Sequence, residues 1–197
     1  GCSLRPDTAR KWVEQSGDDM TLLLGELDKL CALADGGEIT PQLIETASVQ
    51  RLEAKVYDLS KAILRQRYDQ AYAIIHRLYA MREDPIAILA VLAGSYADLY
   101  RAKAAAAAGV PAESLSAEFG CKGREFRMKN AARDCRDLSR QTLRQSLEVL
   151  ADTDTRMKST RADKRVLLEE AAAKKDAENA ANDTNGSITV GDSGIDH

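Results

Sequence analysis

The sequence predicts an all-α protein in which a small helical unit precedes a larger helical bundle. Only 5% of the 197 residues are aromatic, whereas Ala and Leu, two strong helix formers, are abundant. Apolar residues recur every three or four positions over long stretches, which is the period of a helix with one buried face. Helix start signals such as Thr40-Pro41 and stop signals such as Gly36-Gly37 separate these stretches. Together these observations favour helices joined by short connections.

The N-terminal part is expected to form three short helices. The first covers residues 7–16, and the second runs from the N-cap Asp18 to Ala34, where two glycines stop it. The third begins at Thr40-Pro41 and ends near Ser48. A polar junction at residues 49–54 is expected to separate this unit from the rest of the chain.

The middle of the chain predicts helices over residues 54–65, 68–81 and 84–107. The last of these is the longest, and Asp84-Pro85 marks its start. It carries two apolar stripes, so we expect it to contact neighbours on two sides. The stripes are Ile86, Leu89, Ala93, Tyr96 and Tyr100 on one side, and Ile88, Leu92 and Leu99 on the other.

After a break at Gly109-Val110-Pro111, the C-terminal part predicts a short turn or helix over residues 112–120 and a helix over 122–135. Two further helices are expected over residues 140–158, capped by Ser139, and over 161–174.

An acid interrupts the apolar stripe of the 140–158 helix, which runs through Leu143, Leu147 and Leu150. Asp154 stands where the repeat calls for an apolar residue, and Met157 resumes it. One interpretation is that the helix end is solvated at this position. The other is a buried polar contact that determines the packing register.

The charges divide the chain into a near-neutral body and an acidic tail. All 28 Lys and Arg residues precede residue 176, and residues 176–197 contain five acids and no Lys or Arg. We expect this tail to be disordered, because it also lacks apolar periodicity. A near-neutral body is not typical of a protein that binds nucleic acid through overall charge.

The motifs of common active sites are absent from the sequence. It contains no Walker P-loop, no H-E-x-x-H and no G-x-S-x-G. Four scattered cysteines without a C-x-x-C pair, and only two histidines, argue against a zinc site and favour free thiols. We therefore expect no catalytic residue, no cofactor and no metal.

Membrane and secretion signals are also missing from the sequence. No apolar run approaches the roughly 18 residues that a membrane span needs, and no signal peptide is visible. We expect a cytoplasmic protein without a membrane partner. The chain starts with Gly1 rather than Met, so we expect it to be part of a longer protein.

The stretch FGCKGREFRMKNAARDC, residues 119–135, combines glycines, cysteines and bases. It lacks the spacing and hydroxyl of a phosphate loop. A helix between Cys121 and Cys135 would hold them roughly 20 Å apart, too far for a disulfide or a shared metal. The bases could form a solvated helix face or a surface that meets an acidic neighbour or DNA. This candidate basic face comprises Lys122, Arg124, Arg127, Lys129, Arg133, Arg136 and Arg140.

Four segments, in order, carry the pattern of one family. Residues 16–45, SGDDMTLLLGELDKLCALADGGEITPQLIE, contain a leucine helix reading E-L-x-K-L, a glycine break and Ile-Thr before a short helix. The others are VYDLSKAIL (56–64), EDPIAILAVLAGSYADLYRAK (83–103) and LRQSLEVLADTDTRMKSTRADKRVLLEE (143–170). In these features the chain resembles the delta subunit of the bacterial DNA polymerase III clamp loader.

The resemblance implies a domain arrangement. Residues 1–52 would be part of the helical lid of an AAA+ type module, residues 53–175 a helical collar domain for oligomerisation, and residues 176–197 the acidic tail. The family's AAA+ domain, which carries its clamp-binding helix, would not be included.

The resemblance also implies a role without catalysis. The full-length family member binds and opens the sliding clamp for loading onto primed DNA, while neighbouring subunits hydrolyse ATP. This part would assemble with gamma/tau and delta-prime type subunits through the collar and would meet primed DNA only within the assembled loader. The alternative is an independent helical nucleic-acid-binding domain that uses the basic face at residues 122–140.

A subunit seam would lie on the helices at 84–107 and 140–158. Apolar residues there could belong to the core or to the seam. Tyr96, Tyr100 and Arg101 are the candidate interface residues, because Tyr and Arg are enriched where interfaces gain most of their binding energy.

Overall fold

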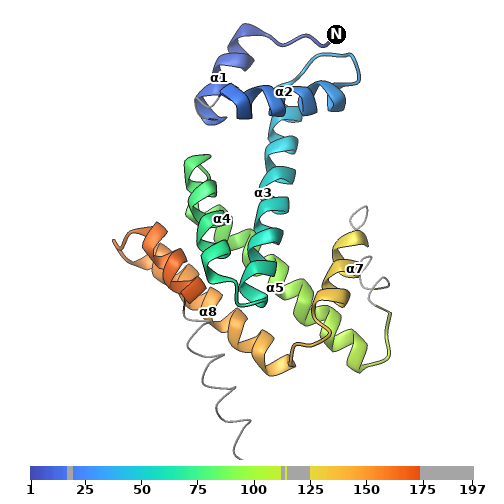
Figure 1. The fold of residues 1–197 in the computed structure, drawn as a ribbon, viewed down its shortest axis with the longest axis vertical. Coiled ribbons are helices and arrows are strands. Elements are labelled where there is room, and N and C mark those ends of the chain that lie inside the picture. The colour runs from blue at the N-terminus through green and yellow to red at the C-terminus, as the bar shows by residue number, and fades with distance from the viewer. Residues whose placement is uncertain (17–19, 112–113, 115–124, 174–197) are drawn as a thin grey trace, which may run out of the picture.

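The computed structural model describes residues 1–16, 20–111, 114 and 125–173 (Figure 1). Helices dominate these residues, which confirms the all-α prediction, and extended pairing within them is limited to one bridge between Ser3 and Glu38. A further helical segment at residues 164–173 follows the last labelled helix. The labelled helices are α1 (Pro6–Ser16), α2 (Met20–Ala34), α3 (Pro41–Leu64), α4 (Tyr68–Ala80), α5 (Pro85–Ala107), α7 (Glu125–Asp134) and α8 (Arg140–Ser159).

Side-chain caps start three of these helices at the positions that the sequence indicates. The hydroxyl of Thr40 accepts a hydrogen bond from the Leu43 N–H at 3.2 Å, and Asp84 accepts one from the Ile86 N–H at 2.9 Å. Ser139 caps α8 in the same way. Each cap satisfies a backbone donor that the first helical turn leaves without a partner. The expected cap Asp18, the turn at 112–120 and the tail lie largely or wholly outside the described residues.

The predicted break at residues 49–54 is wrong, because α3 runs without interruption from Pro41 to Leu64. This stretch is polar but contains no Gly or Pro, and its Gln, Arg, Leu and Glu are good helix formers. Its central residue, Arg51, is largely buried and pairs with Glu26 of α2 at 3.5 Å and with Glu83 at 3.1 Å. The polar residues therefore join the N-terminal helices to the bundle within one helix.

Two hydrophobic clusters lie along α3. The smaller one belongs to α1, α2 and the first part of α3, and the larger one starts at Leu52 and fills the bundle. Figure 1 shows α3 standing between α1 and α2 at one end and the remaining helices at the other. The buried residues of the smaller cluster are Trp12, Leu23, Leu30, Ile39 and Ile44.

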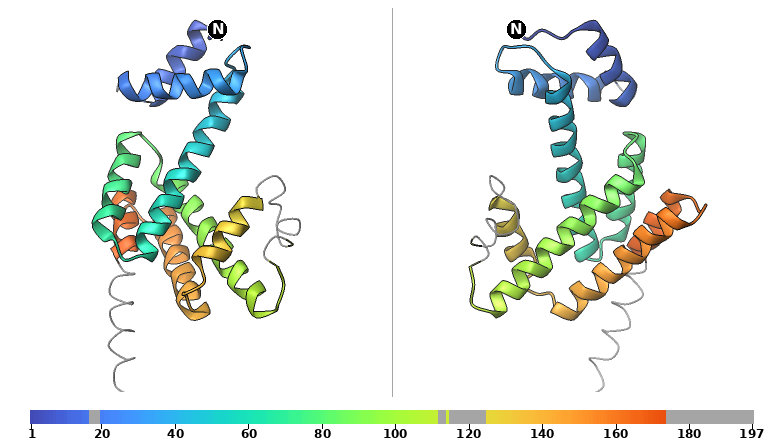
Figure 2. Two further views of the ribbon diagram at one scale, coloured as in Figure 1. Left: turned by 45° about the vertical axis from the view of Figure 1, so that its right-hand side comes forward. Right: turned by 180° about the vertical axis from the view of Figure 1, so that it is seen from behind.

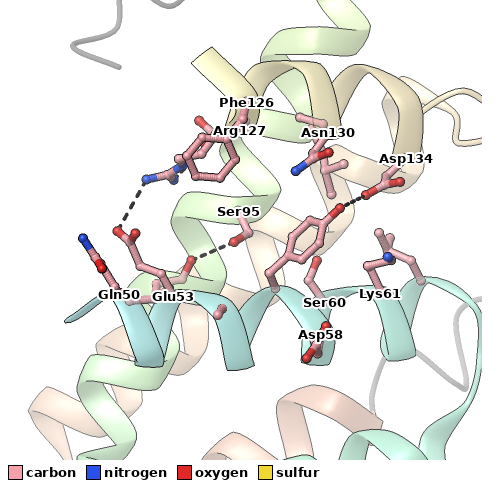
Figure 3. Close-up of a pocket in the computed structure, with 17 residues that line it drawn as sticks. Gln50, Glu53, Asp58, Ser60, Lys61, Ser95, Phe126, Arg127, Asn130 and Asp134 are labelled. Carbon is pink, nitrogen blue, oxygen red and sulfur yellow. Dashed lines mark hydrogen bonds and ion pairs between the residues drawn. The ribbon is translucent and has the colours of Figure 1, made fainter. Parts of the chain in front are cut away.

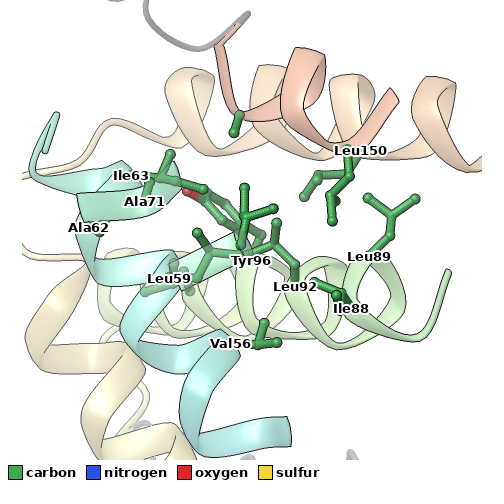
Figure 4. Packing of buried hydrophobic residues seen from close by; sticks show 14 of the residues in the cluster. Val56, Leu59, Ala62, Ile63, Ala71, Ile88, Leu89, Leu92, Tyr96 and Leu150 are labelled. Atoms are coloured by element: carbon green, nitrogen blue, oxygen red, sulfur yellow. The ribbon is translucent and has the colours of Figure 1, made fainter. Parts of the chain in front are cut away.

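The centre of the larger cluster is α5, which packs against α3, α7 and α8 (Figure 2). The expected burial on two sides of this helix is confirmed, since Ile88, Leu92 and Leu99 are buried together with Leu89. Figure 4 shows Ile88, Leu89 and Leu92 in one cluster with residues of α3 and with Leu150 of α8. The helical segment at 164–173 adds Leu167 and Leu168 to the same core.

The acid in the α8 stripe is partly exposed and reaches solvent, so the solvated interpretation holds. The Asp154 side chain keeps 42% of its surface exposed and pairs with Lys158, one turn later, at 2.6 Å. The buried polar residue is its neighbour Thr153, whose hydroxyl donates to the Val149 carbonyl at 2.8 Å. Leu143, Leu150 and Met157 are buried as expected.

Candidate functional site

The candidate interface residues lie in three different environments. Tyr96 is completely buried among the core side chains in Figure 4, and we withdraw it as an interface residue because it presents no surface to a partner. Burial raises the pKa of its hydroxyl well above the ordinary value, and nearby Tyr68 adds to this. Tyr100 is half-buried and packs against the core. Arg101 is partly exposed and pairs with Asp98, one turn before it.

A buried carboxylate anchors the contact between α5 and α7. Asp98 is only 4% exposed, and its two oxygens accept hydrogen bonds from Arg101 at 3.1 Å and from Arg127 at 2.8 Å. Arg127 also lies 3.7 Å from Glu53 of α3, an ion pair that Figure 3 draws as a dashed line. A buried charge is tolerated only when such partners surround it. This network therefore joins α3, α5 and α7.

A second polar network ties the other end of α7 to α3. The Tyr57 hydroxyl donates to Asp134 at 2.7 Å and accepts from the Arg133 guanidinium at 2.8 Å. Arg133 also pairs with Asp134 at 3.0 Å, and the Lys61 ammonium lies 5.1 Å from the centre of the Tyr57 ring.

The second network changes the ionisation of Tyr57 and Asp134. Burial, followed by the hydrogen bond to Asp134, raises the pKa of Tyr57 to about 12. Partial burial opposes ionisation of Asp134, but hydrogen bonds from Arg133 and Tyr57 outweigh it and hold the pKa of this carboxyl below its ordinary value.

Between these networks lies a cavity of about 570 Å³, which we call the α7 groove. Residues of α3, α5 and α7 line it, and Figure 3 shows Arg127, Asn130 and Asp134 of α7 facing residues of α3. Phe126 also lines it and keeps 60% of its surface exposed. Exposed aromatic side chains beside a groove favour contact with a partner.

The candidate basic face is only partly available to a ligand. Arg127 and Arg133 belong to the two networks described above, whereas the side chains of Lys129, Arg136 and Arg140 are exposed. The other two members, Lys122 and Arg124, and also Cys121, lie outside the described residues.

Sequence analysis missed the acidic partners of this face, Asp98, Glu53 and Asp134, and the hydroxyl of Tyr57. One signal was present for Asp98, because it is an acid within an otherwise apolar stretch of a long helix. The other partners come from helices far apart in the sequence, and no periodic pattern relates them.

The described residues offer no cluster placed for metal binding. They contain no group of three or more His, Cys, Asp or Glu side chains placed to hold a metal ion. Cys2, Cys31 and Cys135 are free thiols. No helix in the described part of the chain is long and apolar enough to cross a membrane.

Comparisons with known proteins agree on one family. The model of the DNA polymerase III delta subunit, C-terminal domain, matches residues 53–174. The DNA polymerase III subunit delta of Bacillus subtilis (strain 168) is 28% identical over 151 residues, which are 76% of this chain and 43% of that protein. The solved structure of the Bacillus subtilis DNA clamp loader delta protein matches with a TM-score of 0.61 and 25% identity, covering 88% of this chain and 51% of that one. The chain thus spans about half the length of these relatives.

Proposed function

This chain belongs to the DNA polymerase III delta subunit family, and we propose that it is the non-catalytic part of a DNA clamp loader subunit that assembles with the other loader subunits. The observation that carries the proposal is the match of the family's C-terminal domain to residues 53–174. These residues include the whole larger cluster apart from Leu52, the bundle around α5. The proposed location is the cytoplasm, where bacterial replication takes place.

The proposed domain arrangement follows the two clusters along α3. Residues 1–52 would be part of a helical lid, and residues 53–175 would be the collar that associates with other subunits. The smaller cluster ends at Ala47 and the larger one begins at Leu52, which supports a boundary in this part of α3. We assign binding and opening of the sliding clamp to the N-terminal portion of the relatives, because the match lies on their C-terminal domain.

For assembly we propose two contact surfaces on the bundle. One is the exposed part of Tyr100 and Arg101 on α5, and the other is the mouth of the α7 groove around Phe126. The proposed partners are gamma/tau and delta-prime type subunits, whose helices would cover these surfaces. The polar networks beneath the groove support this role, since they hold α7 in a defined position before a partner binds.

The test is co-elution of the chain with purified gamma/tau and delta-prime type subunits in size-exclusion chromatography. We expect the wild type to co-elute. The double variant Tyr100→Ala with Arg101→Ala should lower the apparent affinity for these subunits at least tenfold, and so should Phe126→Ser alone. Val166→Ser is the matched control, because Val166 is similarly exposed but lies after α8. A folded wild-type chain that never co-elutes would refute the assembly role.

The alternative, an independent nucleic-acid-binding domain that uses the basic face at residues 122–140, is not favoured. The comparisons point to a loader component, and Arg127 and Arg133 are already paired with acids of the same chain. Cations that are paired in this way contribute less to the binding of a phosphate backbone than free ones.

A further inference from the structure

A second group of cations lies where the end of α3 meets α4, and no sequence pattern had pointed to it. The residues line a hollow of about 310 Å³, which we call the α3–α4 basic groove. Asp58 is the single acid among these lining residues. The five cations are Lys55, Lys61, Arg65, Arg67 and Arg77.

The turn between the two helices brings these cations together. Gln66 adopts a left-handed backbone conformation with φ of 57°, and the Arg67 N–H donates to the Ala62 carbonyl at 2.9 Å. Together with the bond from the Gln66 N–H to the Ile63 carbonyl, this is the hydrogen-bond pattern of a Schellman motif, which reverses the chain at the end of α3. The following helix therefore folds back against α3 and faces its basic residues.

Along α4 the lining residues share one face. Arg67, Gln70, Ile74 and Arg77 follow each other at intervals of three, four and three residues, which is the spacing of neighbours on a helix surface. Arg67 and Arg77 are thus about 15 Å apart along the helix axis. On α3, Lys61 and Arg65 are one turn apart. The charge is therefore extended along the groove and is not concentrated at one point.

Four of these cations remain available to a ligand, whereas Lys61 lies over the Tyr57 ring. Within the part of the chain that the structure describes, none of the five forms an ion pair with an acid. Lys55, Arg65, Arg67 and Arg77 are exposed, and Lys61 is half-buried. With five cations and one acid in its lining, the concave surface carries an excess of positive charge, and such a surface attracts anions from solution more strongly than a flat one does.

We propose that the α3–α4 basic groove binds the phosphate backbone of DNA. An acidic peptide would share the charge, but the apolar lining is limited to Ala62, Ile74 and the stems of the basic side chains. Protein partners usually need a larger apolar anchor, whereas phosphate contacts rest on charge and hydrogen bonds alone. Three of the five cations are arginines, whose guanidinium groups match phosphate oxygens in geometry.

The groove also includes the beginning of α4. No side chain caps this helix at Arg67, so the N–H groups of its first turn remain directed outward, where they favour an anion. The inference rests on the proposed function, since a clamp loader works on primed DNA. It adds to that function a DNA contact on the side of the bundle formed by α3 and α4.

Fluorescence anisotropy with a labelled primed DNA tests the proposal, using the 197-residue chain at about 50 and 200 mM salt. We expect Arg65→Ala with Arg77→Ala to weaken binding at least tenfold. The slope of the logarithm of the association constant against the logarithm of the salt concentration should become shallower by about 1.8, because two phosphate contacts are lost. Lys129→Ala with Arg136→Ala is the matched control, since it removes the same charge from the exposed part of the basic face, and we expect less than a twofold change.

Equal losses in both double variants, or no loss in the groove variant, would overturn the proposal. A labelled decamer of glutamate is titrated in parallel. If the peptide binds, loses affinity in the groove variant, and DNA does not bind, the groove is a site for an acidic peptide and the DNA assignment is overturned. Circular dichroism melts confirm that the variants are folded, which is expected because the substituted side chains are exposed.

The variant Arg65→Ala with Arg77→Ala also distinguishes DNA binding by the groove from assembly with the other subunits. We expect it to co-elute with the other loader subunits as the wild type does while it loses DNA binding. Loss of co-elution in the groove variant alone would instead make the groove a subunit contact and overturn the DNA assignment. If the wild type fails to co-elute yet binds DNA through the groove, the assembly proposal fails and the groove proposal stands.

Discussion

The α7 groove and the α3–α4 basic groove both use α3, but their cations have different roles. Around α7, Arg127 and Arg133 bind acids and a phenol of the same chain, so their charges stabilise the position of the helix. In the α3–α4 basic groove, by contrast, the cations have no acid within ion-pair distance among the described residues. The comparison teaches that the surroundings of a basic residue, more than its presence, determine whether it holds the fold or binds a ligand.

The largest expected effect concerns the attachment of α7 itself. Met128 of α7 is fully buried in the core, whereas Phe126 of the same helix is exposed. We expect Met128→Ala to reduce the free energy of unfolding by about 2–5 kcal/mol, because it leaves a cavity in the core. Phe126→Ala should change it by less than about 0.5 kcal/mol. Urea unfolding followed by circular dichroism measures both, and similar values for the two variants would contradict the assigned helix face.

The next effect concerns the buried carboxylate. Asp98→Asn removes the charge that Arg101 and Arg127 share, and we expect a loss of about 1.5–3 kcal/mol in the free energy of unfolding. The control is Asp58→Asn on α3, which should change stability by less than about 0.5 kcal/mol because Asp58 is exposed. If the two substitutions cost the same, the contrast between the buried and the exposed carboxylate fails.

A smaller effect is expected at Tyr57, and it depends on pH. Tyr57→Phe removes the hydrogen bond to Asp134 and should cost about 0.5–1.5 kcal/mol at pH 7. The pKa of Tyr57 is raised to about 12 in the folded chain. Its contribution to stability is therefore complete below pH 10 and is lost as the pH rises from 10 to 12, because only the unfolded chain ionises there.

The free energy of unfolding of the wild type should accordingly fall over this pH range, and that of Tyr57→Phe should fall less. Tyr79 and Tyr96, whose pKa values are also raised by burial, remain in both proteins and cancel in the difference. Parallel curves for the two proteins between pH 10 and 12 would show that the Tyr57 hydroxyl is not held as described.

The smallest effect is expected in the α3–α4 basic groove. Arg65→Ala should change the free energy of unfolding by no more than about 0.5 kcal/mol, because the side chain is exposed and has no acid within ion-pair distance among the described residues. A slight gain is the expected direction, since the substitution relieves repulsion among like charges. Urea unfolding at about 50 mM salt is the measurement, and a loss above about 1 kcal/mol would place Arg65 in a structural network.

Helix positions could be predicted from the sequence wherever a cap or an apolar period marked them. Thr40, Asp84 and Ser139 act as caps, and the ends of α4 and α5 agree with the predicted ends to within one residue. The false break in α3 arose because exposed polar residues on a helix resemble a junction when only their polarity is considered. The turns after α3 and α4 place Gln66 and Arg82 at positive φ. Glycine is the usual residue at such positions, so neither turn could be recognised from the sequence.

The surfaces were harder to predict, because pairing in space determines them. Arg127 looked like a free surface cation, and Tyr96 looked like an interface aromatic. The acids that surround the first come from α3 and α5, and the core that surrounds the second comes from α3, α4, α5 and α8. Such partners are separated by tens of residues, so local spacing carries no information about them.

The continuity of α3 has a mechanical consequence. Its 24 residues form a rod about 36 Å long that belongs to the smaller cluster at one end and to the larger cluster at the other. The middle of α3 contains no Gly or Pro, the residues at which helices usually kink. We therefore expect a rotation at its N-terminal end to reach the bundle. A rotation of the N-terminal helices would therefore turn the bundle with them, and the ion pairs of Arg51 with Glu26 and Glu83 hold α3 near its midpoint.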